Sequence, residues 1–447
     1  MIYFKDDRIT LLHGHVLDEL RTLPDESVHC CVTSPPYFGL RNYGLPPSVW
    51  GGDCKCDHDW TSRRYYTGKS ASAETDEAFS EAGEENAARL PQSRWREDAT
   101  CAKCGAWRGC LGLEPTLEMF IEHIVEVMRE VRRVLQHDGV CWFNMGDSFA
   151  ASGRGGGGGS LNDEDVGKKV DESNNRRKPI EGFKEKDLLL VPSRCAIAMQ
   201  EDGWYVRSEV VWHKLVPMPE SVKDRPTKAH EMVYLLTKSP RYHYDWEAIA
   251  TDAKNPEDDV RRITERASEE HKTMPTDEVN GLRPRANREV RTKVNARDVW
   301  SLGPESFPGA HFATMPTELA KRCLLSGTPK AVCSACASAY EYEYEYEYEG
   351  SSWEERKEQG APMRYGLESP KGTAMNKMGQ SSIKNRKQVA TCQCNAPSAR
   401  SIVLDPFNGA ATTGYVAREL GFNYIGIELN PEYLEISKKR LAQGQLF

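Results

Sequence analysis

The feature that most constrains the fold is a strand, turn, helix and strand near the end of the chain. Residues 401–428 read SIVLDPFNGAATTGYVARELGFNYIGIE. An apolar run ends at Asp405, a turn of small residues and a helical stretch follow, and a second apolar run ends at Glu428. Two strands joined by a helix form a βαβ unit, in which the strands lie parallel. The sequence therefore predicts a parallel sheet.

The N-terminal half shows the same alternation. Within the first 50 residues, ITLLHGHV, LDELRTLP and VHCCVT predict a strand, a short helix and a second strand. Residues 117–135 have apolar residues at helical spacing, and 139–148 contain an apolar run typical of a buried strand. A further helix and two strands are predicted over 188–239. We therefore expect an α/β fold with a mostly parallel sheet and helices on both faces.

The charge distribution leaves two kinds of partner open. The formal net charge of −8 argues weakly against nucleic-acid binding, but the charges are segregated. Residues 74–87 are strongly acidic, whereas 283–297 hold five Arg and one Lys against one Glu. The basic segment could follow a phosphate backbone, or it could be a solvated loop.

The start of the chain, MIYFKDDRIT, does not resemble an export signal, and no long uncharged apolar run is present. We therefore expect a cytoplasmic protein. In that compartment fourteen cysteines favour reduced thiols or metal ligands over disulfides.

The cysteines fall into two groups with zinc-ligand spacing, each with two short pairs separated by a long excursion. We expect structural zinc held by Cys56, His58, Cys101 and Cys104, and by Cys333, Cys336, Cys392 and Cys394. Cys54 and Cys110 are alternative ligands of the first group. Cys30, Cys31 and Cys141 lie in apolar runs and are expected in the core.

A stiff segment follows the predicted strand VHCCV. Residues 32–40 read VTSPPYFGL, and two consecutive prolines end the strand because proline has no backbone N–H and favours extended geometry before it. We call Ser34–Tyr37 the proline arm. By itself it could be a strand-terminating turn.

The turn after Asp405 has features of a nucleoside site. Glu428, at the end of the second strand, could accept hydrogen bonds from both ribose hydroxyls. Phe407 lies within the turn, and Ala411 stands where dinucleotide sites have a third glycine. The turn therefore suits an uncharged nucleoside tail better than a diphosphate.

Together, TSPPY and DPFNGAATTG resemble the amino-directed DNA methyltransferases that use S-adenosylmethionine, and their order resembles the permuted β group of that family. Two further segments, 208–239 and 311–328, are similar to the family's segments beside the target base and before the cofactor turn. The resemblance implies a Rossmann-like methyltransferase fold with inserted zinc-binding and recognition segments.

The resemblance implies roles for the proline arm. The lone pair of an exocyclic amino group is delocalised into the base, so the Ser34 oxygen and the Pro35 carbonyl would orient the amino protons. Pro35 and Pro36 would fix both acceptors. Tyr37 would stack on a base flipped out of double-stranded DNA.

The resemblance also implies a set of cofactor-binding residues for S-adenosylmethionine. They are Asp405, Phe407, Gly409, Glu428, Phe312 and Pro316. Ser34 favours cytosine N4 over adenine N6, because serine is a neutral acceptor and adenine-specific members carry aspartate there. Two alternatives remain: adenine N6 methylation, and an inactive zinc-bearing DNA-binding protein on a methylase scaffold. A cognate restriction enzyme, phage self-protection and gene regulation are equally compatible, in a bacterial or phage-infected cell.

The expected organisation follows the motifs. In chain order it comprises the start of the catalytic half of the core (1–50), an insertion with a zinc site (51–116), the core continued with a flexible loop at 151–186 (117–245), a target-recognition region (246–300), a core helix (301–332), an insertion with the second zinc site (333–398) and the cofactor-binding βαβ unit (399–447).

Overall fold

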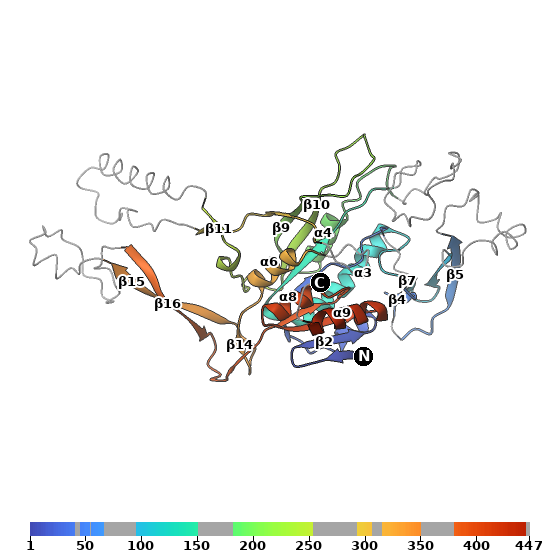
Figure 1. Cartoon of the computed structure of the whole chain (residues 1–447). Coiled ribbons are helices and arrows are strands. Elements are labelled where there is room, and N and C mark those ends of the chain that lie inside the picture. Colours follow the sequence, from blue (N-terminus) through green and yellow to red (C-terminus); the bar gives the residue numbers. More distant parts are fainter. Residues whose placement is uncertain are drawn as a thin grey trace, which may run out of the picture. The chain divides into compact units, whose positions relative to one another are not determined.

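The structure, a computed structural model, describes residues 1–40, 45–53, 55–66, 95–150, 182–253, 293–305, 315–349 and 380–443. The chain divides into two compact units (Figure 1). The first comprises residues 1–245, 297–329 and 400–447, and the second 246–296 and 330–399. Phe312, Cys54, the acidic segment 74–87 and most of the predicted recognition region lie outside the described residues.

A nine-stranded sheet organises the first unit, with the order β1-β2-β19-β18-β3-β8-β10-β9-β13. From β2 to β8 every neighbouring pair is parallel, and β1, β10 and β9 add antiparallel pairs. The strands are β1 (Ile2–Lys5), β2 (Ile9–His13), β3 (Val28–Thr33), β8 (Leu135–Met145), β9 (Tyr205–Lys214), β10 (His230–Thr237), β13 (Val299–Leu302), β18 (Ile402–Asp405) and β19 (Asn423–Glu428). The expected mostly parallel α/β sheet is confirmed.

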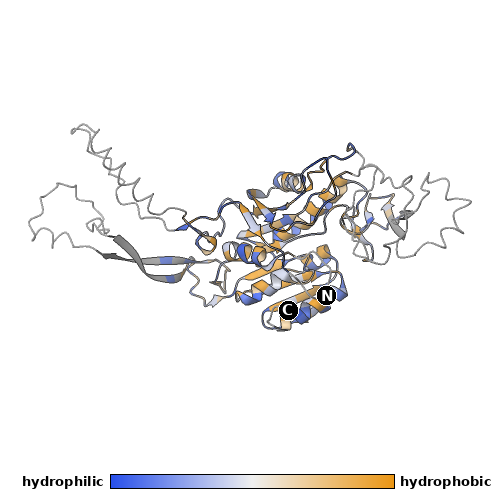
Figure 2. Cartoon of the chain, turned by 45° about the horizontal axis from the view of Figure 1, so that its top comes forward, coloured by the Kyte–Doolittle hydropathy of each residue, from blue (hydrophilic) through white to orange (hydrophobic). Residues whose placement is uncertain are grey.

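Helices cover both faces of this sheet. On one face α1 (Val16–Arg21), α3 (Leu117–Val134) and α4 (Val191–Glu201) pack on one another. Their core includes Cys31, Cys141 and Phe143, which are alternate strand residues on that face. On the other face lie α6 (Thr317–Gly327), α8 (Thr412–Glu419) and α9 (Pro431–Gln443). Figure 2 shows hydrophobic residues along the strands and on the helix sides turned to them.

Helix α3 forms where its sequence predicts. The Thr116 hydroxyl caps its N-terminus by accepting a hydrogen bond from Met119 N at 3.2 Å. Leu117, Phe120 and Ile124 lie on one face and are buried. None of the described helices combines the length and the apolar character that crossing a bilayer requires.

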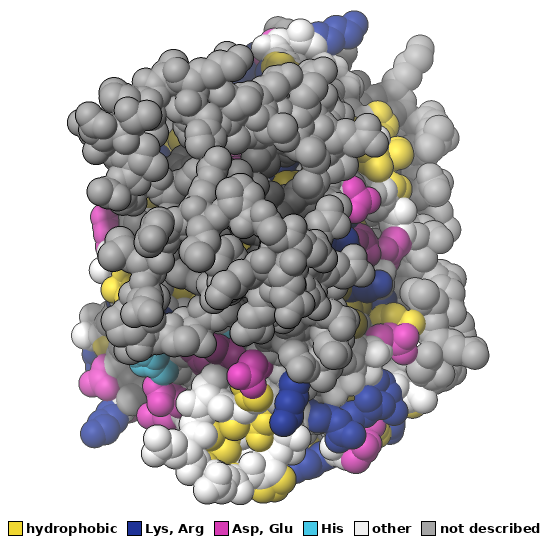
Figure 3. All heavy atoms as spheres, turned by 90° about the vertical axis from the view of Figure 1, so that its left-hand side faces the viewer, with side chains coloured by type: hydrophobic (Ala, Val, Ile, Leu, Met, Phe, Trp, Pro, Cys, Tyr) yellow, Lys and Arg dark blue, Asp and Glu magenta, His cyan; other side chains and the backbone are white. Residues whose placement is uncertain are grey.

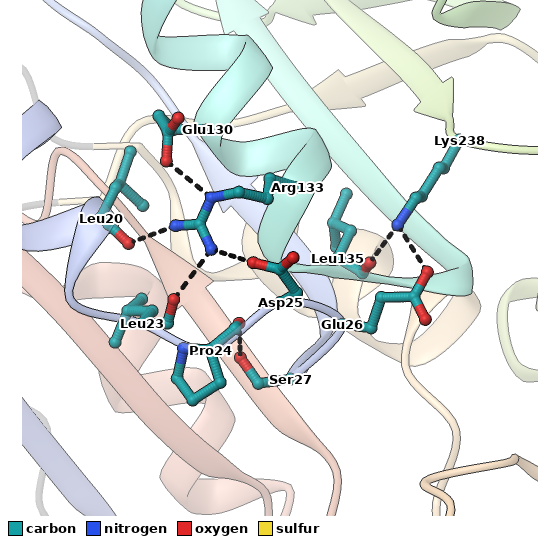
Figure 4. A network of polar contacts seen from close by, with 10 residues as sticks. All are labelled: Leu20, Leu23, Pro24, Asp25, Glu26, Ser27, Glu130, Arg133, Leu135 and Lys238. Atoms are coloured by element: carbon teal, nitrogen blue, oxygen red, sulfur yellow. Dashed lines mark hydrogen bonds and ion pairs between the residues drawn. The ribbon is translucent and has the colours of Figure 1, made fainter.

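Arg133 near the end of α3 fixes the loop that leads into β3 (Figure 4). Its guanidinium donates to the carbonyls of Leu20 and Leu23 at 2.8 and 3.0 Å, and it pairs with Glu130 at 2.8 Å and with Asp25. Because the Arg133 guanidinium donates to four acceptors, it ties helix α1, the loop and helix α3 together. The loop before β3, the strand that carries the proline arm, is therefore held in place.

The first unit also contains a four-stranded sheet of order β4-β7-β6-β5, formed by β4 (Ser48–Trp50), β5 (Trp60–Tyr66), β6 (Trp95–Cys101) and β7 (Trp107–Gly109). The second unit contains three two-stranded pairs: β11 (Thr251–Asp252) with β12 (Lys293–Val294), β14 (Val332–Cys333) with β17 (Ser398–Ala399), and β15 (Tyr340–Glu349) with β16 (Gln380–Ala390). On the described part of the face in Figure 3, side chains of Lys and Arg lie beside those of Asp and Glu.

Candidate active site at the carboxyl edge of the sheet

The proline arm and the cofactor turn, which we define as Asp405–Ala411, leave the same edge of the sheet. The strands β3 and β18 are parallel neighbours, so their carboxyl ends meet there. The Thr33 hydroxyl donates to the Asp405 carboxylate at 2.8 Å and joins the two strand ends. The chain leaves β18 towards β19 and leaves β3 towards β8, in opposite directions along the sheet. Open α/β sheets bind ligands in the crevice at such a switch point.

Three other side chains hold the tip of the proline arm. Ser34 Oγ lies 3.1 Å from Asn144 Oδ1 and 3.2 Å from the Tyr37 hydroxyl. The Tyr37 hydroxyl lies 2.9 Å from Asn144 Oδ1 and 2.6 Å from Glu231 Oε2. Lys214 pairs with the second oxygen of Glu231. The hydroxyls of the arm therefore belong to a network that spans β8, β9 and β10.

Two glycines allow close packing around the arm. A Cβ atom on Gly146 would lie 2.4 Å from Cε2 of the Tyr37 ring, so only glycine leaves room for the ring there. Gly112 has φ +89°, and a Cβ on it would lie 3.0 Å from the Tyr37 carbonyl oxygen. The Gly112 carbonyl accepts a hydrogen bond from Gly39 N at 2.8 Å. The arm therefore rests against the turn that contains Gly112.

A buried pair stands behind this turn. Glu114 Oε2 accepts from Gly112 N at 2.8 Å, and Glu114 Oε1 lies 3.0 Å from His123 Nδ1 on α3. The Glu114 side chain is fully buried, and burial raises the pKa of its carboxyl. Glu114 fixes Gly112 N, and Gly112 in turn packs against the backbone of the arm, so Glu114 supports the position of the arm indirectly.

A cavity of about 140 Å³ adjoins the network. It is several times the volume that a water molecule occupies in the liquid, about 30 Å³. Its lining includes Met145, Asp147, Lys228, His230, Glu231 and Met232. Lys228 Nζ lies 3.6 Å from Asp147 Oδ2, and burial lowers the pKa of this ammonium. The cavity therefore combines apolar walls with the Lys228 cation and three carboxylates, those of Asp147, Glu209 and Glu231.

Apart from the bond between Thr33 and Asp405, the cofactor turn is held by residues nearer to it in the chain. Phe407 N donates to Asp405 Oδ1 at 3.1 Å, and Gly409 N donates to Glu428 Oε2 at 2.8 Å. From α9, Arg440 donates to the Ala410 carbonyl at 3.0 Å. Ala411 adopts a left-handed conformation, with φ 57°, directly before α8.

Both carboxylates at this edge are desolvated. Burial raises the pKa of Asp405 to about 6, although the Thr33 hydroxyl and Phe407 N oppose the rise. Burial also raises the pKa of Glu428, against hydrogen bonds from Asn430 N and Gly409 N. Pro316 is the buried N-cap residue of α6. The structure therefore gathers Ser34, Asp405 and Glu428 at one edge.

The predicted metal ligands form two groups of four, and in each group the ligand atoms lie within 4.8 Å of one another. They are Cys56, His58, Cys101 and Cys104 in the first unit, and Cys333, Cys336, Cys392 and Cys394 in the second. Cys110 stands apart, with Sγ 3.3 Å from the carbonyl of Leu45. Cys30, Cys31 and Cys141 are buried, as expected.

Several residues of the site were not predicted from the sequence, among them Asn144, Glu114, Lys228 and Glu231. Asn144 lies at the carboxyl end of the strand beside β3, and that position was a usable signal for it. Lys228 and Glu231 lie within 208–239, the segment expected beside the target base, but nothing in the sequence singled them out, and Glu114 carries no signal. Their partners are 9 to 194 residues away in the chain.

Comparison with known proteins gives consistent matches. A family model described as DNA methylase matches residues 28–332 and 378–439. The type II methyltransferase M.Cfr9I of Citrobacter freundii is 30% identical over 436 residues, which cover 98% of this chain and 88% of that protein. M.SmaI of Serratia marcescens is 28% identical, covering 97% and 90%. Among solved structures, the cytosine-N4-specific PvuII DNA methyltransferase is 12% identical with a TM-score of 0.46, covering 100% of this chain and 90% of that one.

Proposed function

Because the chain belongs to the DNA methylase family, and is thus a DNA methyltransferase of the cytosine N4 or adenine N6 type, we propose that it methylates cytosine N4. The observation that carries the proposal is the network of Ser34, Tyr37 and Asn144 at the sheet edge that also holds Glu428. Ser34 is the neutral residue that the resemblance associates with cytosine. The assignment to the permuted β group rests on the order of the two motifs in the chain.

The arm would act by orienting the amino group of the base. The Ser34 hydroxyl has one proton, which it donates within the network, so its lone pairs are free to accept an amino proton. The Pro35 carbonyl would accept the other proton. Two fixed acceptors turn the nitrogen lone pair out of the ring plane towards the methyl donor, and prolines limit the cost of holding this geometry.

The methyl donor is S-adenosylmethionine, whose sulfonium supplies an activated methyl group. Glu428 lies at the edge of the sheet where a ribose could be bound. Its carboxylate is held in place by hydrogen bonds from Gly409 N and Asn430 N, both at 2.8 Å. Phe407, Gly409 and Pro316 would complete the pocket, with Phe312 outside the described residues. Asp405 would act mainly by fixing the turn, because its carboxylate faces Thr33 and Phe407 N.

The target base would leave the duplex and enter the cavity beside the network. An amino group inside a base pair cannot reach the arm, so flipping is required. Tyr37 would stack on the base, with its hydroxyl fixed by Glu231. Lys228 and Asp147 supply a donor and an acceptor on the cavity wall for the polar edge of the base.

The decisive experiment combines labelled S-adenosylmethionine with several unrelated DNAs. Mass analysis of the digested nucleosides should yield N4-methylcytosine. Methylation of adenine N6 would replace this proposal by the alternative, and unlabelled DNA would remove both. Calorimetry with S-adenosylmethionine tests the donor separately, because an inactive scaffold should release no heat of binding.

We extend the proposal to zinc at both cysteine groups. The Sγ atoms of Cys56 and Cys101 are 3.9 Å apart. A tetrahedron with Zn–S bonds of about 2.3 Å has sulfurs roughly 3.8 Å apart, so the spacing fits zinc. Four protein ligands close each site, which favours a structural role. Elemental analysis should give two zinc ions per chain, and chelation should lower the melting temperature before it lowers methyl transfer. Fewer than one zinc per chain would remove the idea.

A further inference from the structure

The loop 215–229 connects β9 to β10 (Figure 1), and it ends beside the cavity, which Lys228 lines. Lys214 N donates to the Ala229 carbonyl at 2.8 Å and closes the neck of the loop. Lys228, which immediately precedes the neck residue Ala229, lines the cavity, as does Glu231 on β10. A group that projects from this loop therefore stands next to the place where the proposed target base would be held.

Large apolar side chains of this loop face solvent. Leu215, Val216 and Met218 are 57%, 68% and 85% exposed, and Met218 is the most exposed large hydrophobic residue that the structure describes. An isolated exposed apolar residue needs no explanation, but three in four consecutive positions beside a site indicate a contact surface.

The loop presents Met218 in a stiff setting. Pro217 and Pro219 flank it, and proline fixes its own φ and restricts the residue before it to extended geometry. Farther along, Arg225 pairs with Glu220 at 2.7 Å and lies 3.8 Å from the Phe149 ring centroid. The loop is thus anchored, and little backbone entropy would be lost when Met218 binds.

Duplex DNA fits this surface better than a protein partner does. Lys223 on the same loop is exposed and can face a phosphate. A base that is flipped out leaves a gap in the stack, and DNA-bending proteins fill such gaps with apolar side chains, methionine among them. A methionine on a restricted backbone, beside the cavity that receives the base, is in the right place for that task.

We propose that Met218 enters the duplex as the wedge that fills the gap left by the target base, with Val216 packing beside it. The inference rests on the proposed function, because it requires a flipped base. The wedge would stabilise the open duplex by contacting the base opposite the target. It would contribute little where that opposite base is missing.

The test uses Met218→Ala and, as a matched control, Ile2→Ala, which truncates a 59% exposed residue on β1 at the end of the sheet away from β9 and β10. The DNA is a duplex oligonucleotide around a site that the wild-type enzyme methylates. A second duplex carries an abasic site opposite the target. We expect Met218→Ala to lower kcat/KM at least tenfold on the intact duplex, and to come within threefold of wild type on the abasic duplex.

Other results overturn the wedge. If Met218→Ala matches Ile2→Ala on the intact duplex, the loop does not enter DNA. If both duplexes lose activity equally, Met218 acts elsewhere in the site. If the wild-type enzyme transfers no methyl group to any DNA, the proposed function itself fails and this inference falls with it, so the two failures are distinguishable.

Discussion

The proline arm and the cofactor turn follow adjacent parallel strands of one sheet, yet they are held in different ways. The tip of the arm depends on side chains far away in the chain, since Tyr37 reaches Asn144 and Glu231, 107 and 194 residues on. Apart from Asp405, which accepts from the Thr33 hydroxyl 372 residues away, the cofactor turn depends on nearer neighbours, since Gly409 N is bonded to Glu428, 19 residues on.

The difference matches two tasks. A nucleoside pocket needs a stable shape, and the βαβ unit supplies it through hydrogen bonds from backbone N–H groups of the turn to the carboxylates of Asp405 and Glu428. A group that orients a reacting amino nitrogen needs exact placement, which is given by side chains from several elements. We therefore expect substitutions in the arm to lower turnover, and substitutions in the turn to weaken cofactor binding.

Ser34→Ala should give the largest effect. Removal of one hydrogen-bond donor that stabilises a transition state costs about 10²–10³-fold in rate, and for the loss of the Ser34 acceptor we expect a fall in kcat of about 10³-fold. The affinity for S-adenosylmethionine should change less than threefold, because the cofactor turn is intact. Single-turnover kinetics and calorimetry measure the two quantities. Ser27→Ala, which removes a hydroxyl bonded to the Pro24 carbonyl, is the control. If Ser34→Ala lowered the affinity for S-adenosylmethionine as much as it lowers kcat, the arm and the cofactor turn would not have separate tasks.

The same contrast explains what the sequence could predict. Apolar periodicity predicted β2, β3, β8, β9, β10, β18 and β19 of the large sheet, but not β1 or β13. Asp405 and Glu428 were predicted from their positions at strand ends, and the role of Ser34 from the resemblance. The segment 208–239 was expected beside the target base, but the contact of Glu231 with Tyr37 was not predicted, because it depends on how β10 pairs with β8 and β9. Both cysteine groups were found because metal ligands carry their own spacing.

Glu428→Gln should affect the cofactor turn and weaken the binding of S-adenosylmethionine. Glutamine keeps one acceptor, so one of the two backbone donors at 2.8 Å and one ribose hydroxyl would lose a partner. We expect the Kd for S-adenosylmethionine to rise about 30-fold, or about 2 kcal/mol, with kcat at saturating donor within threefold of wild type. The exposed Glu432→Gln on α9 is the matched control. A loss of kcat without a change in Kd would reverse the assignment.

Glu114→Gln tests whether the buried contact of Glu114 with Gly112 N and His123 helps to position the proline arm. The amide oxygen can accept from Gly112 N while the NH₂ donates to His123 Nδ1, but this removes the negative charge of the pair and requires the other tautomer of His123. We expect kcat to fall about tenfold with both KM values within twofold, because Gly112 touches the arm and not the cofactor turn. The control is Glu118→Gln, on the exposed side of α3. A positioning role predicts that Glu114→Asp restores part of the rate. If thermal stability falls while kcat stays unchanged, Glu114 supports the fold alone.

Asp405 joins the two regions, and its titration gives the smallest predicted effect. Burial raises the pKa of this carboxyl from the usual 3.8 to about 6. The folded chain therefore binds a proton where the unfolded chain does not, and the resulting stability is fully present below pH 3.8 and lost as the pH rises through 6. Between pH 7 and pH 5 the free energy of unfolding should increase by about 1 kcal/mol, since one pKa unit corresponds to about 1.4 kcal/mol.

The test compares wild type with Asp405→Asn, which cannot titrate at this position. Urea unfolding of the two zinc-loaded proteins at both pH values isolates this gain from the contribution of all shared groups. The exposed Asp18→Asn should follow wild type. An identical pH dependence for wild type and Asp405→Asn would mean that the Asp405 carboxyl is ionised in the folded protein throughout this range, and that Thr33 and Phe407 N offset its burial.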